Sequence, residues 1–418
     1  GKTWYKSTTY ERTKIKAIQF IDEYNLGEGV TVLESWDASV GQDEAVMAYI
    51  LDDFTLIIAG RGEGVIYANP DSSYAFADYV DYEGDSSYSF ANVTSLMGEN
   101  IFDTSKTTNM SNMFRYFGRY KSTFDFDFSF LDTSNVTNMS YMFNYAGYNS
   151  TSVDLDFSGL DTSKVVDMSY MFGYMGYTAT TFNLEVDILE TANNSNMNRM
   201  FYYAGYTAEN FELDLSQFNT SNVTTMMYMF AYVGYNAPSI ELSLNFDTSK
   251  VTNMSYMFYK MGYNSSDVSL TGLENWNTSN VETMGVMFYN VGYAATSVDF
   301  GNLGGWDTSK VTNMEVMFSA TGWDAEHFYI GDLSNWNTSN VTDMRATFNV
   351  CGMSDPNWNI GDLSTKIVTR DDGTTYTAWD VSKVTNMEST FYGAGIAALD
   401  FSLGDLSTWN VSNSTTMS

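Results

Sequence analysis

Few side chains in this sequence could carry out catalysis. His327 and Cys351 are the single histidine and the single cysteine of the chain. A Ser-His-Asp relay needs a histidine beside its nucleophile, and the usual zinc sites draw several ligands from histidine and cysteine. The sequence therefore argues against a metalloenzyme of the His/Cys kind and against a cysteine or serine hydrolase. We expect no catalytic residues, no cofactor and no metal site, and no functional role for His327.

Carboxylates are the abundant titratable groups. The chain has 51 Asp and Glu against 19 Lys and Arg, which gives a formal net charge of −32. A glycosidase would need two carboxylates at a defined separation, and no spacing singles out such a pair. Binding to nucleic acid or anionic lipid needs cationic side chains that release counterions, so a polyanion is a poor partner for either. No stretch approaches 18 consecutive apolar residues, so we also expect no membrane insertion.

Most of the chain is built from one repeated sequence phrase, which must determine where its side chains lie. The phrase is Asp-Thr-Ser-Lys/Asn-Val-Thr-Asn-Met-x-x-Met-Phe. It recurs from about residue 102, and an incomplete eleventh copy begins at Asn410. A unit of about 30 residues cannot bury its own core, so neighbouring units must stack. We therefore predict that residues 101–418 form a solenoid of about ten 29–30-residue repeats plus a partial eleventh. Its closing phenylalanines are Phe114, Phe143, Phe172, Phe201, Phe230, Phe258, Phe288, Phe318, Phe348 and Phe391.

Each repeat should contain a short strand and a short helix. Residues 152–157 alternate apolar and polar side chains with period two, which is typical of a strand. Apolar residues at i, i+3, i+4 and i+7 predict the buried stripe of a helix, ended by Gly147 in a left-handed conformation. The fold class predicted from this pattern is a leucine-rich-repeat-like solenoid with short strands and short helices. In the second repeat the stripe consists of Met139, Met142, Phe143 and Ala146.

Residues 1–100 lack the repeat. Four segments there alternate apolar and polar residues between turn signals, and they predict a β-rich N-terminal cap domain that shields the first repeat. The four segments are Thr13–Asp22, Gly29–Val40, Val46–Gly60 and Gly64–Asn69. The chain starts at Gly1 without an initiator methionine or a signal-peptide pattern, so we expect a mature or trimmed product.

The repeat resembles the Met-rich repeats of BspA-like leucine-rich-repeat surface proteins of bacteria. The phrase at 306–314, Trp-Asp-Thr-Ser-Lys-Val-Thr-Asn-Met, followed by Met317 and Phe318, carries the resemblance. The phrases Glu34–Ser39 and Ala68–Tyr74 are similar to the region that precedes such repeats in that family. The resemblance implies an extracellular, cell-surface protein that acts in adhesion or interaction, and it implies no catalytic residues.

Two polar positions of the phrase alternate together along the chain. Asp247 and Lys250 in one repeat are followed by Asn277 and Asn280 in the next. Stacking identical charges about 5 Å apart would be repulsive, and alternation with neutral asparagine doubles that separation. We interpret the pattern as structural spacing rather than a calcium ladder. Cys351 takes a position held by alanine or valine in other repeats, so we expect a small buried hydrophobe.

Tyrosines form a second recurring set away from the Met and Phe stripe, with three in some repeats and fewer in others. Tyrosine offers a large contact area at low entropic cost together with a hydroxyl group, so a partner surface is one interpretation. Packing of tyrosines between neighbouring repeats is the other. The candidate partner surface consists of Tyr141, Tyr145, Tyr148, Tyr170, Tyr174, Tyr177, Tyr203, Tyr206, Tyr228, Tyr232, Tyr235 and Tyr263.

The longer ninth-to-tenth connection contains Asp372-Gly373 between β-branched runs, which predicts a hairpin over residues 366–377. The predicted function is non-enzymatic recognition at the cell surface, with host or cell-surface protein or glycan as partner. Self-assembly is the other hypothesis, because the repeat stops at Ser418 midway through a unit, and an open edge favours head-to-tail contact between copies. A monomeric adhesin domain cut from a longer surface protein is the alternative.

Overall fold

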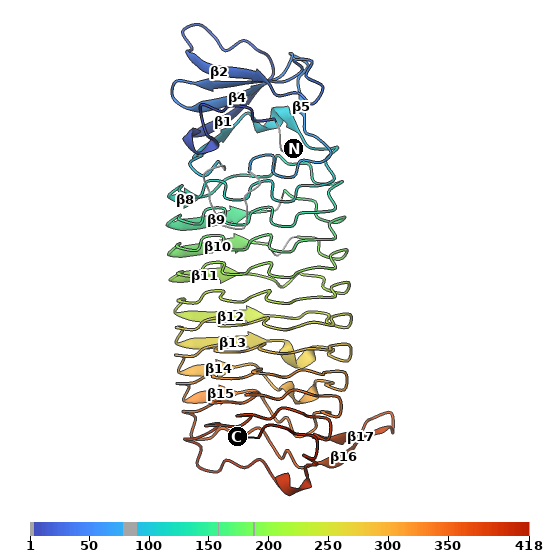
Figure 1. Ribbon diagram of the computed structural model, residues 1–418. Helices are drawn as coiled ribbons and strands as arrows, with labels where there is room; N and C mark the ends of the chain where they lie inside the picture. The colour runs from blue at the N-terminus through green and yellow to red at the C-terminus, as the bar shows by residue number, and fades with distance from the viewer. Residues whose placement is uncertain (1–3, 78–89, 158, 187–188, 418) are drawn as a thin grey trace. The chain divides into compact units, whose positions relative to one another are not determined.

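A computed structural model describes residues 4–77, 90–157, 159–186 and 189–417 (Figure 1). The chain divides into two compact units, Gly1–Asn194 and Ser195–Ser418. Both units contain short strands from successive repeats. The predicted boundary near residue 100 falls inside the first unit and stays a prediction, and residues 1–3 and 78–89 of the predicted cap lie outside the described residues.

A mixed five-stranded sheet begins the first unit, with strand order β2-β3-β4-β1-β6. Strand β1 pairs in parallel with β4 and β6, whereas β3 pairs antiparallel with β2 and β4. The predicted segment 46–60 contains two of these strands, because Asp52 and Asp53 form a turn within it. The strands are β1 (Ala17–Ile21), β2 (Val32–Asp37), β3 (Met47–Leu51), β4 (Thr55–Ala59) and β6 (Ser95–Met97). Single-turn 3-10 helices are η1 (Arg12–Lys14) and η3 (Glu99–Ile101).

The repeats of the first unit pair side by side in parallel. Ser152 in β9 faces Thr181 in β10, which lies one repeat further along the chain. Val153 and Leu155 are buried, while Asp154 and Asp156 are exposed. The strand predicted from the period-two alternation is therefore confirmed, with its apolar side chains on the buried face. The remaining strands of this unit are β5 (Ile66–Tyr67), β7 (Phe102–Asp103), β8 (Thr123–Phe124), β9 (Ser152–Asp156) and β10 (Thr181–Glu185).

A further repeat-like segment, at residues 70–76, was not recognised in the sequence. Asp71 bridges Asn109 in parallel, and the Phe76 ring stacks on Phe114 with centroids 5.2 Å apart. Tyr74 has the same left-handed φ, 57°, as tyrosines in later repeats. The shared Ser-Tyr-x-Phe spacing is the signal that could have identified it.

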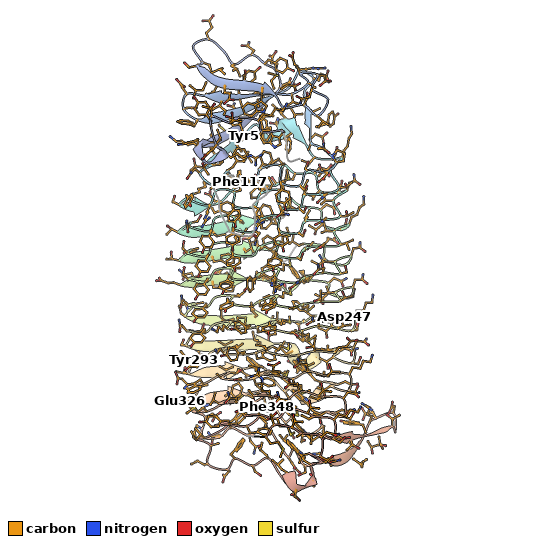
Figure 2. The ribbon with its side chains drawn as sticks, viewed as in Figure 1. Tyr5, Phe117, Asp247, Tyr293, Glu326 and Phe348 are labelled. Atoms are coloured by element: carbon orange, nitrogen blue, oxygen red, sulfur yellow. The ribbon has the colours of Figure 1, made fainter. Side chains whose placement is uncertain are left out.

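The second unit repeats the same arrangement. Strands β12 to β15 pair in parallel, one strand from each repeat. A column of phenylalanines fills the interior; Phe258 stacks on Phe288 at 5.2 Å, and Phe318 on Phe348 at 5.5 Å (Phe348 is labelled in Figure 2). The strands are β11 (Asn210–Leu213), β12 (Ser239–Ser243), β13 (Asp267–Thr271), β14 (Ser297–Asp299), β15 (His327–Tyr329), β16 (Lys366–Thr369) and β17 (Thr375–Ala378). The 3-10 helices are η4 (Leu273–Asn275), η5 (Leu303–Gly305) and η6 (Leu406–Thr408).

The prediction of a short helix in each repeat is wrong. The described residues contain no α-helix, and residues 140–149 form consecutive turns. The N–H of Met142 donates to the Met139 carbonyl, an i to i+3 bond, whereas the N–H groups of Tyr141 and Phe143 donate to carbonyls of the next repeat. An α-helix needs each of those N–H groups for the carbonyl four residues earlier. Pairing between repeats therefore replaces the helix.

The side chains of the predicted stripe are nevertheless buried. Met139, Met142, Phe143 and Ala146 have no exposed surface. Gly147 has the predicted left-handed φ, 56°, and a Cβ atom there would lie 2.7 Å from the Phe124 ring. The i, i+3, i+4 spacing thus identified which residues are buried but not the backbone that carries them.

The hairpin in the long connection is confirmed. Strands β16 and β17 pair antiparallel, with Lys366 opposite Ala378, and Gly373 in the turn has a φ of 80° (Figure 1). The Tyr376 hydroxyl donates to the Asn335 carbonyl at 2.6 Å, which ties the hairpin to an earlier repeat of the same unit. Ile367 remains 69% exposed, so one side of the hairpin faces solvent.

Candidate functional site: the tyrosine columns

The tyrosines of the candidate surface are positioned by the consecutive turns. Two positions in most repeats have a left-handed backbone, as at Tyr141 (φ 59°) and Tyr145 (φ 60°). A bulky residue seldom adopts this conformation, and it persists here because the N–H groups of Tyr141 and Tyr145 each donate to a carbonyl of the next repeat. A third tyrosine, such as Tyr148, follows the turn glycine directly. Because the repeats are in register, equivalent tyrosines come to lie over one another.

In the first unit the tyrosines stack face to face. The Tyr141 and Tyr170 ring centroids are 4.4 Å apart, with planes inclined by 13°. Tyr145 stacks on Tyr174 at 4.3 Å, and Tyr148 on Tyr177 at 4.8 Å. Packing between repeats, one of the two interpretations of these residues, is therefore present.

The second unit continues the pattern with its own columns. Tyr203 stacks on Tyr232 at 4.0 Å, and Tyr228 on Tyr256 at 4.4 Å. A longer column ends at Tyr293, labelled in Figure 2, which stacks on Trp323 at 5.4 Å. That column consists of Tyr206, Tyr235, Tyr263 and Tyr293, with centroid separations of 4.6, 4.8 and 4.7 Å.

All twelve tyrosines of the candidate surface are half-buried. Their ring faces are used within the columns, while part of each side chain stays accessible to solvent. Burial raises the pKa of the Tyr145 phenol to about 12, with the Tyr116 phenol adding to the shift. Burial likewise raises the pKa of the Tyr228 phenol to about 12, with the Tyr256 phenol adding to the shift. At neutral pH the phenols of Tyr145 and Tyr228 are therefore uncharged groups that can donate hydrogen bonds.

Several residues that pack with these tyrosines were missed in the sequence, and one of them, Tyr116, is buried. Tyr116 stacks on Tyr145 at 4.6 Å and begins a column in the first repeat. It stands two residues after the closing phenylalanine, as Tyr145 does, and that offset could have identified it. Tyr259 and Tyr289 form a further stacked pair at 5.3 Å. The Lys260 amine lies 5.8 Å from the Tyr232 ring centroid, within range of a cation–π interaction.

The alternating Asp/Lys and Asn positions form a ladder of direct contacts. The Lys310 amine donates to the Asn280 side-chain oxygen at 2.5 Å, and the Asn280 amide donates to the Ser249 carbonyl at 2.7 Å. The Asp247 carboxylate, labelled in Figure 2, accepts from the Ser249 N–H at 2.9 Å, and hydrogen bonding from Ser249 lowers the pKa of Asp247. Neutral asparagine therefore serves as acceptor for lysine as well as spacing like charges apart.

The residues considered for chemistry lie apart from these columns. Cys351 is fully buried, and burial raises the pKa of its thiol well above the ordinary value. His327 is exposed on β15. Within the described ranges, no three His, Cys, Asp or Glu side chains lie together as a metal ion would require.

A pocket of about 420 Å³ lies in the first unit. Its walls are mainly apolar, including Trp4, Ile58, Phe76 and Phe102. Arg61 at this pocket is 3.6 Å from the Asp43 carboxylate, so its charge is already paired. The pocket thus has no uncompensated charge from Arg61 with which to orient a ligand.

Comparison with known families gives one match. Five overlapping segments of the chain match a family described as "Mycoplasma protein of unknown function, DUF285". The segments are 85–208, 148–270, 204–292, 261–374 and 369–418, which together span residues 85–418. Comparisons with curated proteins and with solved structures gave no match. In the described part of the chain, no helix has the length and apolar character needed to cross a membrane.

Proposed function

The chain belongs to the DUF285 family, whose matches span residues 85–418, and we propose that it is a non-enzymatic recognition protein displayed outside the cell. In this proposal the repeats form a leucine-rich-repeat-like solenoid similar to those of BspA-like surface proteins. The solenoid presents the tyrosine columns to a host or cell-surface protein or glycan. The half-buried state of all twelve tyrosines is the observation that carries the proposal.

The columns suit recognition for physical reasons. Stacking fixes each ring before a partner arrives, so little side-chain entropy remains to be lost on binding. Tyrosine combines an apolar ring with a hydroxyl group, and it is enriched at protein interfaces. The phenols with a raised pKa remain hydrogen-bond donors at physiological pH.

Adhesion of protein-coated beads to cultured host cells tests this function. Tyr148→Ser with Tyr177→Ser removes one stacked pair that follows the turn glycines. We expect the double variant to lose most of the adhesion while it keeps the circular dichroism spectrum of the parent protein. Tyr329→Ser is the matched control, because Tyr329 is 52% exposed on β15 and belongs to none of the columns described above. Equal adhesion of both variants would contradict the proposal.

Self-association is a second candidate. Three apolar side chains near residue 396 are strongly exposed: Tyr392 at 70%, Ile396 at 68% and Leu399 at 82%. Exposed apolar clusters of this kind mark contact surfaces, and a second copy is one partner that could cover them. Light scattering over a concentration series tests this candidate. A particle that stays at 46.9 kDa at high concentration would contradict it.

A further inference from the structure

Two arginines stand among the tyrosines of the first repeat. The Arg115 guanidinium lies 5.2 Å from the Tyr116 ring centroid and 5.7 Å from that of Tyr141. The Arg119 guanidinium lies 4.7 Å from the Tyr148 centroid and 5.5 Å from that of Tyr120. Both side chains are half-buried and flank Phe117, which Figure 2 labels. Cation–π contacts therefore hold two positive charges on this face.

Among the described residues, neither of these two charges has a carboxylate partner. Elsewhere in the described residues, Arg61 pairs with Asp43, Lys121 with Asp125, and Arg370 with Asp307. Neither the Arg115 nor the Arg119 guanidinium forms an ion pair or a hydrogen bond with any described residue, and both Nε atoms are buried without an acceptor. The two guanidinium groups lie 5.2 and 5.6 Å from the same Tyr116 ring centroid. In a chain with 51 acidic residues and a net charge of −32, two such groups without a partner among the described residues are unexpected.

The surroundings of the two arginines favour one kind of ligand. The Tyr116 ring stacks on Tyr145, and Tyr148 stacks on Tyr177, so these faces are not free to stack on a sugar ring. Tyr116 is buried, whereas Tyr120 is exposed and Tyr148, Arg115 and Arg119 are half-buried. Their hydroxyl and guanidinium groups are hydrogen-bond donors. A guanidinium binds a carboxylate through two parallel hydrogen bonds. Arginine and tyrosine also dominate the binding energy of protein interfaces.

We propose that Arg115 and Arg119, with Tyr120 and Tyr148, form a docking surface for an acidic polypeptide segment of a partner protein. This inference rests on the proposed recognition function and names the chemistry of the partner. Carboxylates of the segment pair with the two guanidinium groups, and its backbone carbonyls accept from the phenol hydroxyls. Tyr120 is 50% exposed and lies beside Arg119. At physiological salt the Debye length is about 8 Å, so the distant acidic residues of the chain oppose the contact only weakly.

Fluorescence anisotropy with a short labelled polyglutamate peptide tests the proposal on the full chain. We expect the parent protein to bind it, and Arg115→Gln with Arg119→Gln to weaken binding by about tenfold or more. The matched control is Lys106→Gln with Lys164→Gln, which changes the net charge equally. Lys106 lies over the Tyr67 ring and Lys164 binds Asn135, both outside the patch. The control should bind like the parent.

Three results would overturn the inference: no binding of polyglutamate to the parent, equal weakening by the arginine and lysine variants, or binding of oligogalacturonate in place of the peptide. If the double arginine variant loses its circular dichroism signal, Arg119→Lys keeps the charge but not the two parallel hydrogen bonds. It should bind with intermediate affinity, and unchanged affinity would count against the inference. Cell adhesion that depends on Tyr148 and Tyr177 would leave the proposed function standing in any of these cases.

Discussion

The backbone of the repeat can be tested at Ser389. This residue is half-buried and has a left-handed φ of 55°, in the stretch where the sequence predicted a helix. We compare Ser389→Gly with Ser389→Ala, because both variants remove the same hydroxyl group. In a left-handed conformation a Cβ atom costs about 1–2 kcal/mol, and the greater unfolded-state freedom of glycine offsets part of that. The glycine variant should therefore be more stable than the alanine variant by about 1 kcal/mol.

The measurement is urea unfolding followed by circular dichroism. In a thermal unfolding experiment the same difference of about 1 kcal/mol would appear as a shift of about 2–4 °C in melting temperature for a unit of this size. In a helix the order would be reversed, with alanine more stable by about 1 kcal/mol. The control is the same pair of substitutions at Ser297, whose backbone is extended in β14, where alanine should be the more stable. A more stable alanine variant at Ser389 would refute the consecutive-turn backbone.

Three further predictions concern the core, the hairpin and the tyrosines. Phe258 is fully buried between two stacked phenylalanines. In chemical denaturation, Phe258→Ala should lower the free energy of unfolding by about 3–5 kcal/mol, and Phe258→Leu should lower it by less than about 1.5 kcal/mol. Deleting residues 366–377 should shift the melting temperature by only a few degrees, because surface insertions add little loop entropy, and calorimetry showing collapse of the fold would contradict this. The pKa values of Tyr145 and Tyr228 rise from 10.0 to about 12 on folding. The stability that these two phenols contribute is therefore fully present below pH 10 and is lost as pH rises through about 12. Tyrosinate absorbance that titrates near pH 10 in the folded protein would contradict this prediction.

The side-chain pattern predicted burial well because burial is what the pattern records. The alternation at residues 152–156 and the Met and Phe stripe both correspond to buried side chains. The same pattern could not reveal the backbone, since i, i+3, i+4 spacing fits consecutive turns as well as a helix. Only the hydrogen bonds from Tyr141 and Phe143 to the next repeat distinguish them. The hairpin was predicted correctly because Asp372-Gly373 specifies a turn locally.

The candidate site was predictable in part for a related reason. Once the repeats are in register, equivalent tyrosines must lie over one another, so the columns follow from the spacing. The contacts of Arg115 and Arg119 did not follow, because each arginine occurs at its position in one repeat and contributes no periodic signal. The lysine–asparagine ladder was interpreted as charge spacing alone. The hydrogen bond from Lys310 to Asn280 also depends on whether the lysine side chain is long enough to reach the neighbouring repeat.

Hydroxyl-radical footprinting of the protein bound to host cells tests the central claim, that the tyrosine columns form the recognition surface. Binding should protect Tyr148, Tyr177 and Tyr235 from oxidation relative to the free protein. Exposed Tyr329 on β15, outside these columns, should react equally in both states. Protection of Tyr329 with no change at the column tyrosines would contradict the account.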